Sequence, residues 1–297
     1  MPKLIVPAAT PIDAERRIDN GLLAAHCHVL LSDGADAIAL FGTTGEATSF
    51  SGSERMAALE GLIAAGIPAE KVMPGTGCPS VVETISLSRH AFEQGCETVM
   101  TLPPYYYKAV SEDGVAEAIT WLIEGLKGLN PKIILYHIPP VAHVGFSVKL
   151  VRRLADAFPG VITGVKDSSG EWSNTEALLA ACPDLDIYPG SETFLLPGLR
   201  KGGAGCITAT GNLNARAIRA VIDEADPTVA DTRHEEIVAY RKTVEARPLI
   251  AAIKTVLSDR YGKPSWRAVR PPLQSLPEEQ IQPLLDGLAR LESQPVA

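Results

Sequence analysis

The pattern that decides the fold is Ile162-Thr163-Gly164-Val165-Lys166-Asp167-Ser168-Ser169-Gly170, a short apolar run that ends in polar residues. A helix-patterned segment follows it, and the same alternation recurs along the chain. Alternation of this kind is typical of βα units and of a parallel sheet. We therefore expect an α/β fold, a (β/α)8 TIM barrel. The eight predicted strands are residues 5–9, 37–41, 72–76, 98–102, 133–138, 162–166, 187–189 and 206–209.

Strand patterns stop near residue 212, whereas helix patterns continue beyond it. The 297 residues suit one barrel of about 250 residues with an extension. We expect a catalytic barrel over residues 1–212 and a C-terminal helical extension over residues 213–297. The helices predicted after the barrel are residues 217–225, 230–246, 249–261 and 278–293.

Several helix starts carry capping boxes, in which a serine side chain accepts an amide bond and a glutamate three residues later reaches back. Such pairs satisfy amides that have no partner inside the helix. Another helix is predicted over residues 147–158 from its apolar face. The capping pairs are Ser51 with Glu54, Ser80 with Glu83, and Ser173 with Glu176.

Composition and charge exclude several classes of function. A formal net charge of -8 argues against a nucleic-acid partner, because binding to nucleic acid depends first on clustered cationic side chains. No apolar run reaches the roughly 18 residues of a membrane span, and the N-terminus does not resemble a signal peptide. The five cysteines form no C-x-x-C pair, which favours a reducing cytoplasm.

Lys166 is the strongest candidate for chemistry, because a lysine that ends an apolar barrel strand is seldom buried without a role. Barrel active sites lie at the C-terminal strand ends, and burial there favours the uncharged amine that forms imines. A lysine paired with a carboxylate at the barrel rim is the alternative. Asp167 should point into the helix layer, since neighbouring strand residues face opposite ways. Tyr136 should lie beside Lys166 on the adjacent strand.

The loop after the second predicted strand, Gly42-Thr43-Thr44-Gly45-Glu46, offers hydroxyls and backbone amides that suit a carboxylate. It lacks the Gly-Lys-Ser/Thr ending of a Walker loop, and we find no dinucleotide fingerprint. The sequence also shows no spaced set of His, Cys and carboxylate ligands for a metal. We therefore expect no cofactor and no metal.

Five motifs together resemble the dihydrodipicolinate synthase / N-acetylneuraminate lyase family, whose members are class I pyruvate-dependent aldolases. They follow one another in the family order, and the resemblance runs from residue 4 to about residue 273. It implies a (β/α)8 barrel with a helical extension, a cytoplasmic lyase acting on a small 2-keto acid, and a homotetramer built as a dimer of dimers. The motifs are Gly42-Thr43-Thr44-Gly45-Glu46, Pro104-Tyr105-Tyr106, Tyr136-x-x-Pro139, Gly164-x-Lys166-Asp167-x-x-Gly170 and Gly190-Ser191-Glu192.

The resemblance also implies roles for individual residues. Lys166 would form an imine with the keto carbon, and Tyr136 would transfer protons with Thr43 in the relay. Thr44 would bracket the substrate, and the loop amides that begin at Gly42 would hold its carboxylate.

Further positions match the family around the pocket. Tyr106 corresponds to a tyrosine that reaches into a neighbouring subunit's site, with Tyr105 as the alternative in the alignment. Gly190 and Ile207 match positions that line the pyruvate pocket. His143 is a further candidate, from the loop after the fifth predicted strand, with a solvated loop histidine as the alternative.

One position departs from the family pattern. Val141 occupies the place where dihydrodipicolinate synthases have an arginine that binds the carboxylate of the aldehyde substrate. An apolar side chain cannot replace that clamp. We therefore expect aldol cleavage, condensation or dehydration of a 2-keto-3-deoxy acid. The alternatives are dihydrodipicolinate synthase proper, a non-catalytic keto-acid sensor and a metal-dependent class II aldolase.

Overall fold

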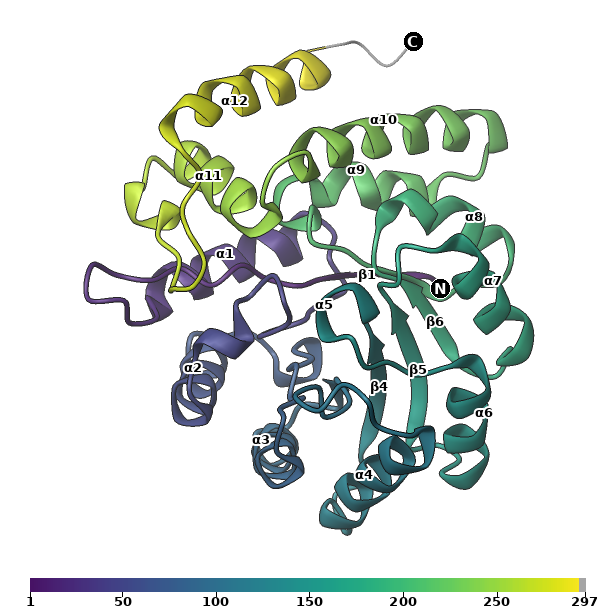
Figure 1. Cartoon of the computed structure of the whole chain (residues 1–297). Helices are drawn as coiled ribbons and strands as arrows, with labels where there is room; N and C mark the ends of the chain where they lie inside the picture. The colour runs from purple at the N-terminus through teal and green to yellow at the C-terminus, as the bar shows by residue number, and fades with distance from the viewer. Residues whose placement is uncertain (294–297) are drawn as a thin grey trace.

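The structure, a computed structural model, describes residues 1–293. Parallel strands form a barrel, and helices surround it (Figure 1). The strands pair in the orders β2-β1-β7 and β3-β4-β5-β6. The Ala204 amide donates to the Ile187 carbonyl at 3.0 Å, which links the two groups of strands between β6 and β7. The strands are β1 (Lys3–Val6), β2 (Ala37–Ile38), β3 (Thr98–Thr101), β4 (Lys132–His137), β5 (Ile162–Asp167), β6 (Asp186–Pro189) and β7 (Gly205–Ile207).

The third predicted strand, residues 72–76, lies between β2 and β3 but is not a regular strand. It makes single parallel bridges to Ile38 and to Met100. Pro74 in its middle has no N–H to donate, so a continuous ladder cannot form. The Pro74 carbonyl still accepts a bond from the Met100 amide at 2.9 Å. The prediction is therefore wrong about a regular strand here, although the segment fills that place in the barrel.

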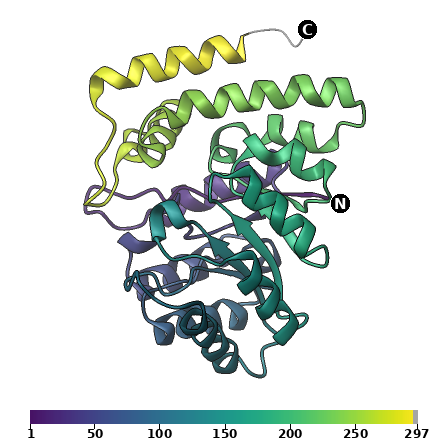
Figure 2. The same ribbon diagram turned by 45° about the vertical axis from the view of Figure 1, so that its right-hand side comes forward.

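Helices α1 to α4 and α6 to α9 surround the barrel, the short α5 lies at the C-terminal ends of the strands, and α10, α11 and α12 lie together along one side of the barrel (Figures 1 and 2). Three apolar residues of α9 belong to the main core, namely Ala215, Ile218 and Val221. The predicted domain boundary at residue 212 therefore falls inside a helix that packs on the barrel. The helices are α1 (Asn20–Ser32), α2 (Gly52–Ala64), α3 (Val81–Glu93), α4 (Glu112–Gly125), α5 (Pro139–Ala142), α6 (Val148–Ala157), α7 (Trp172–Ala181), α8 (Leu195–Arg200), α9 (Gly211–Asp223), α10 (Pro227–Glu245), α11 (Leu249–Tyr261) and α12 (Glu278–Glu292).

The predicted helix starts have different outcomes. Ser51 forms the full capping box of α2 with Glu54, and Ser80 caps α3 by accepting the Glu83 amide. The box predicted at Ser173 is wrong, because α7 begins at Trp172 and Ser173 already lies inside the helix.

The inside of the barrel is filled by apolar side chains that point inward from the strands. This filling is what a barrel of this size requires, since its interior is a packed core. Tyr136 belongs to this interior cluster, so its ring lies among apolar neighbours. The other buried members are Ile5, Ala39, Met73, Met100, Ile134, Ile138, Ala142, Tyr188 and Ile207.

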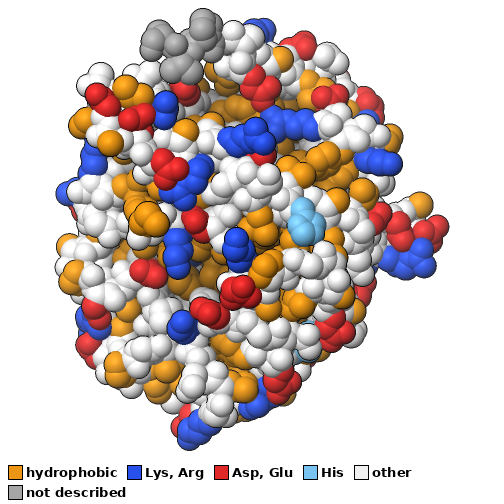
Figure 3. All heavy atoms as spheres, turned by 180° about the vertical axis from the view of Figure 1, so that it is seen from behind, with side chains coloured by type: hydrophobic (Ala, Val, Ile, Leu, Met, Phe, Trp, Pro, Cys, Tyr) orange, Lys and Arg blue, Asp and Glu red, His pale blue; other side chains and the backbone are white. Residues whose placement is uncertain are grey.

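The molecular surface is mixed in charge on the face seen from behind. Lys and Arg side chains alternate there with Asp and Glu and with apolar groups (Figure 3). None of the helices within residues 1–293 has both the length and the apolar character needed to cross a membrane.

Candidate active site

Lys166 lies near the C-terminal end of β5, and its position depends on Gly164. A Cβ atom at Gly164 would lie 2.3 Å from the Asp186 carbonyl oxygen, so only glycine allows β6 to approach this closely. Pairing of β4 with β5 places Tyr136 opposite Lys166. Lys166 is 4% exposed, and its Nζ lies 4.2 Å from the centroid of the Tyr136 ring. The amine and the phenol predicted to be neighbours thus lie together.

Asp167 faces the opposite way. Its Oδ2 accepts a hydrogen bond from the Thr175 hydroxyl of α7 at 2.6 Å, and its Oδ1 accepts from the Ser169 amide at 3.0 Å. The expectation that this carboxylate points into the helix layer is confirmed. It is not the ion-pair partner of Lys166.

Tyr136 connects the lysine to the loop after β2. Its hydroxyl lies 3.1 Å from Thr43 Oγ1, and either oxygen can donate. A proton can therefore pass between these two hydroxyls beside the Lys166 amine.

The loop itself is held by its own backbone. The amides of Gly45 and Ala47 both donate to the Gly42 carbonyl, at 3.1 and 3.3 Å. Within residues 1–293, the amides of Thr43 and Thr44 donate to no backbone carbonyl. Two adjacent amides are thus available to bind an anionic oxygen.

A cavity of about 470 Å³ opens beside this loop at the C-terminal ends of the strands, and we call it the barrel cavity. Of the predicted site residues, those that line it are Gly42, Thr43, Tyr106, Tyr136 and Val141.

The remaining predicted residues do not line the barrel cavity. Lys166 lies next to the cavity, because its Nζ contacts the ring of Tyr136, which is a lining residue. Thr44 and Ile207 are buried in the barrel, at 6% and 0% exposed, and Gly190 is half-buried at the end of β6. His143 is exposed at the end of α5.

The aromatic run after β3 divides into inner and outer members. Tyr105 is half-buried and lines the barrel cavity, and burial raises the pKa of its hydroxyl. Tyr106 is 72% exposed and stacks edge to face on Tyr107. Most of its ring surface is therefore accessible for contact with another molecule.

Sequence reasoning missed a buried ion pair behind the loop. Lys254 of α11 lies 2.6 Å from Glu46 Oε1, and both side chains are 0% exposed. The Lys254 ammonium also donates to the Thr10 carbonyl at 2.8 Å. Burial lowers the pKa of Lys254, and the neighbouring Glu46 carboxylate opposes that shift. A lone lysine inside the apolar run Leu249–Leu257 was the signal for this pair.

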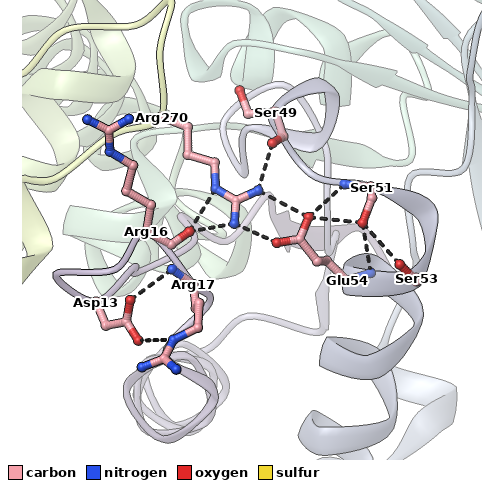
Figure 4. Close-up of polar contacts among 8 residues, drawn as sticks. All are labelled: Asp13, Arg16, Arg17, Ser49, Ser51, Ser53, Glu54 and Arg270. Carbon is pink, nitrogen blue, oxygen red and sulfur yellow. Dashed lines mark hydrogen bonds and ion pairs between the residues drawn. The ribbon is translucent and has the colours of Figure 1, made fainter.

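Arg270 makes a second connection between the extension and the barrel (Figure 4). Its Nε donates to the Arg16 carbonyl at 2.8 Å, its Nη1 to the Ser49 carbonyl at 2.9 Å, and its Nη2 to the Glu54 carboxylate. The bond from Arg270 is the main reason that the pKa of Glu54 falls to about 2. All three guanidinium nitrogens of Arg270 therefore donate hydrogen bonds within the chain.

The Arg270 backbone also takes part, since its amide donates to Glu46 Oε2 at 3.1 Å. Glu46 therefore has both carboxylate oxygens bound by the extension. We call the set of Glu46, Lys254, Arg270 and Glu54 the seam.

Comparison with known proteins identifies the family. The family model of the dihydrodipicolinate synthetase family matches residues 1–290. The chain belongs to this family. An uncharacterized DapA-like lyase of Chloroflexus aurantiacus is 31% identical over 278 residues, which cover 92% of this chain and 91% of that protein.

Solved structures agree with this assignment. Dihydrodipicolinate synthase from Agrobacterium tumefaciens strain C58 is 35% identical with a TM-score of 0.91, over 98% of this chain and 99% of that one. The prophage protein YagE of E. coli K12, solved in complex with pyruvate, is 25% identical with a TM-score of 0.90, over 98% and 99%. The predicted family and barrel fold are confirmed, and the matches support the predicted class I aldolase-type lyase.

Proposed function

We propose that the chain is a Schiff-base lyase or synthase that acts on pyruvate or another 2-keto acid, with Lys166 as the nucleophile. The observation that carries this proposal is the buried Lys166 amine beside the Tyr136 ring, with the Tyr136 hydroxyl 3.1 Å from Thr43. Amine, phenol and hydroxyl supply a nucleophile and a proton relay.

The reaction begins when the Lys166 amine attacks the keto carbon. Water leaves, and a protonated imine forms between the lysine nitrogen and that carbon. Loss of a proton from C3 gives an enamine, because the imine accepts the electron pair. Tyr136 and Thr43 carry the protons that these steps require.

The carboxylate of the keto acid fits the loop after β2. The amides of Thr43 and Thr44 are available there, and Thr44 brackets the bound acid. Gly190 and Ile207 form the floor of the keto-acid site in this proposal.

The proposal also concerns the chemical class of the second substrate. Val141 lines the barrel cavity where an aldehyde carboxylate would need a cation. We therefore favour aldol cleavage, condensation or dehydration of a 2-keto-3-deoxy acid over condensation with aspartate semialdehyde. Synthase action on aspartate semialdehyde is the alternative, since relatives such as that of Synechococcus sp. strain WH7803 are named 4-hydroxy-tetrahydrodipicolinate synthase.

We further propose a homotetramer in which Tyr106 enters the site of a neighbouring subunit. Its 72% exposure in the single chain is consistent with that role.

Borohydride trapping tests the proposal. Reduction in the presence of pyruvate should add one pyruvate-derived mass to the peptide that contains Lys166. The Lys166→Arg variant should acquire no adduct, whereas Lys201→Arg, at a side chain that is 51% exposed, should be labelled like the wild type. An unlabelled wild-type peptide would exclude the imine.

A keto-acid sensor on the same barrel is distinguished by proton exchange. The enzyme should exchange the methyl protons of pyruvate in deuterated water. Binding of pyruvate without exchange would favour the sensor.

A further inference from the structure

One wall of the barrel cavity comes from the end of β4 and from α5. Its side chains are Ile138, Val141 and Ala142. Val141 is 59% exposed in the single chain, so this wall presents an aliphatic side chain to whatever enters.

A second part of the lining comes from the C-terminal extension, through Ile250, Pro272 and Leu273. Arg270 fixes the start of this segment through its bonds to Arg16, Ser49 and Glu54 (Figure 4). The second wall is therefore a built part of the cavity, and it is apolar as well.

The charged groups on the cavity are already bound within the chain. Glu46 is held by Lys254 and by the Arg270 amide. Lys108 donates to the Tyr105 carbonyl at 2.6 Å and to the Ala142 carbonyl at 3.1 Å. Lys108 is the one cation among the described lining residues. Its ammonium has three N–H groups, and two of them donate to these carbonyls.

A carboxylate that left water to enter this space would meet no guanidinium among the described lining residues and only the partly occupied ammonium of Lys108; the hydroxyls there, such as those of Thr48 and Ser49, are neutral. Polar groups that lose water without gaining hydrogen bonds bind poorly, whereas an apolar group gains from burial.

We propose that the second substrate is an aldehyde whose substituent is apolar, either aliphatic or aromatic, and that it occupies the space that these two walls line. The inference rests on the proposed function and names its substrate class.

The chemistry balances without another reactant. The enamine C3 forms a bond to the aldehyde carbon, and the carbonyl oxygen takes a proton from the Tyr136–Thr43 pair. Water then hydrolyses the imine, which frees Lys166 and a 4-hydroxy-2-keto acid. Cleavage is the reverse of these steps.

An aldehyde panel with pyruvate tests the inference. Benzaldehyde and 2-methylpropanal should have kcat/KM about 100-fold above succinic semialdehyde, aspartate semialdehyde and glyceraldehyde. Equal or faster turnover of the charged or hydroxylated aldehydes would overturn the inference.

Matched variants locate the effect. Val141→Arg should lower kcat/KM for benzaldehyde and raise it for succinic semialdehyde by roughly 10-fold or more, since a charged hydrogen bond is gained. Val82→Arg is the control, because Val82 is also 59% exposed but lies on α3. Identical aldehyde preferences in the two variants would contradict the assigned walls.

Imine trapping with pyruvate separates the two proposals. If Lys166 is labelled but apolar aldehydes are not preferred, or no aldehyde is consumed, only this inference fails. If Lys166 is not labelled, the proposed function itself fails.

Discussion

Two lysines are buried among residues 1–293, and their surroundings differ. Lys254 in the seam is 0% exposed and lies 2.6 Å from the Glu46 carboxylate. Lys166 in the barrel is 4% exposed and faces the Tyr136 ring. The Lys254 amine is part of a buried ion pair, whereas the Lys166 amine beside a phenol is the one that we propose as the nucleophile.

The two regions are nevertheless connected through one loop. Glu46 ends the sequence that begins at Gly42, and its backbone has a φ of 56°. A non-glycine residue in this left-handed conformation needs support from its surroundings. Lys254 and Arg270 supply that support through the Glu46 carboxylate, so the extension shapes the loop that carries Thr43 and Thr44.

The largest effect should come from Lys166→Ala. Loss of the nucleophile should reduce kcat by about 10,000-fold or more, because the covalent intermediate can no longer form. Steady-state rates together with urea unfolding check this. Retained activity would show that Lys166 is not the nucleophile and that the two buried lysines do not differ in role. An unfolding curve like that of the wild type is the control for correct folding of the variant.

Tyr136→Phe should have the next effect. It keeps the ring beside Lys166 but removes the hydroxyl that meets Thr43, so kcat should fall by about 100-fold to 1,000-fold. The rate of methyl-proton exchange should fall with it. Thr43→Val should show a smaller loss of the same kind, and full activity in both variants would exclude the relay.

The sequence was informative where local rules decide position. Parallel strands bring their C-terminal ends together, so Lys166 and Tyr136 could be placed beside each other from spacing alone. Alternation along a strand likewise predicted the direction of Asp167. Pro74 shows the limit of pattern reading, because an apolar run was correctly placed but could not form a regular ladder.

Contacts between distant segments could not be predicted in this way. Glu46 and Lys254 are 208 positions apart, and no periodicity connects them. The walls formed by Ile250 and Leu273 depend on how the extension packs against the barrel. Lys254 inside an apolar helix was nevertheless a visible anomaly, of the same kind that drew attention to Lys166.

Lys254→Met tests the structural role of the Lys254–Glu46 ion pair. It leaves the buried Glu46 carboxylate without its partner, which should destabilise the fold by about 3 to 5 kcal/mol. Urea unfolding measures the loss, and KM for pyruvate should rise because the loop loses support.

The double variant Lys254→Met, Glu46→Gln is the control for this interpretation. Removing both charges should recover part of the stability. A double variant no more stable than Lys254→Met would mean that the charge on Glu46 is not the cause.

The smallest effect concerns His26, which joins the extension to the barrel by bonds to Tyr261 and Asn212. Burial lowers the pKa of His26 from 6.5 to about 4, so the folded state keeps it neutral while the unfolded chain takes up a proton. Stability should be full above pH 6.5 and should fall by up to about 3 kcal/mol as the pH drops toward 4. His26→Gln should flatten this part of the profile in urea unfolding, whereas His28→Gln, at an exposed position on the same helix, should not. Equal slopes in the wild type and His26→Gln would show that other groups cause the acid sensitivity, because subtracting the two profiles removes every contribution that the variants share.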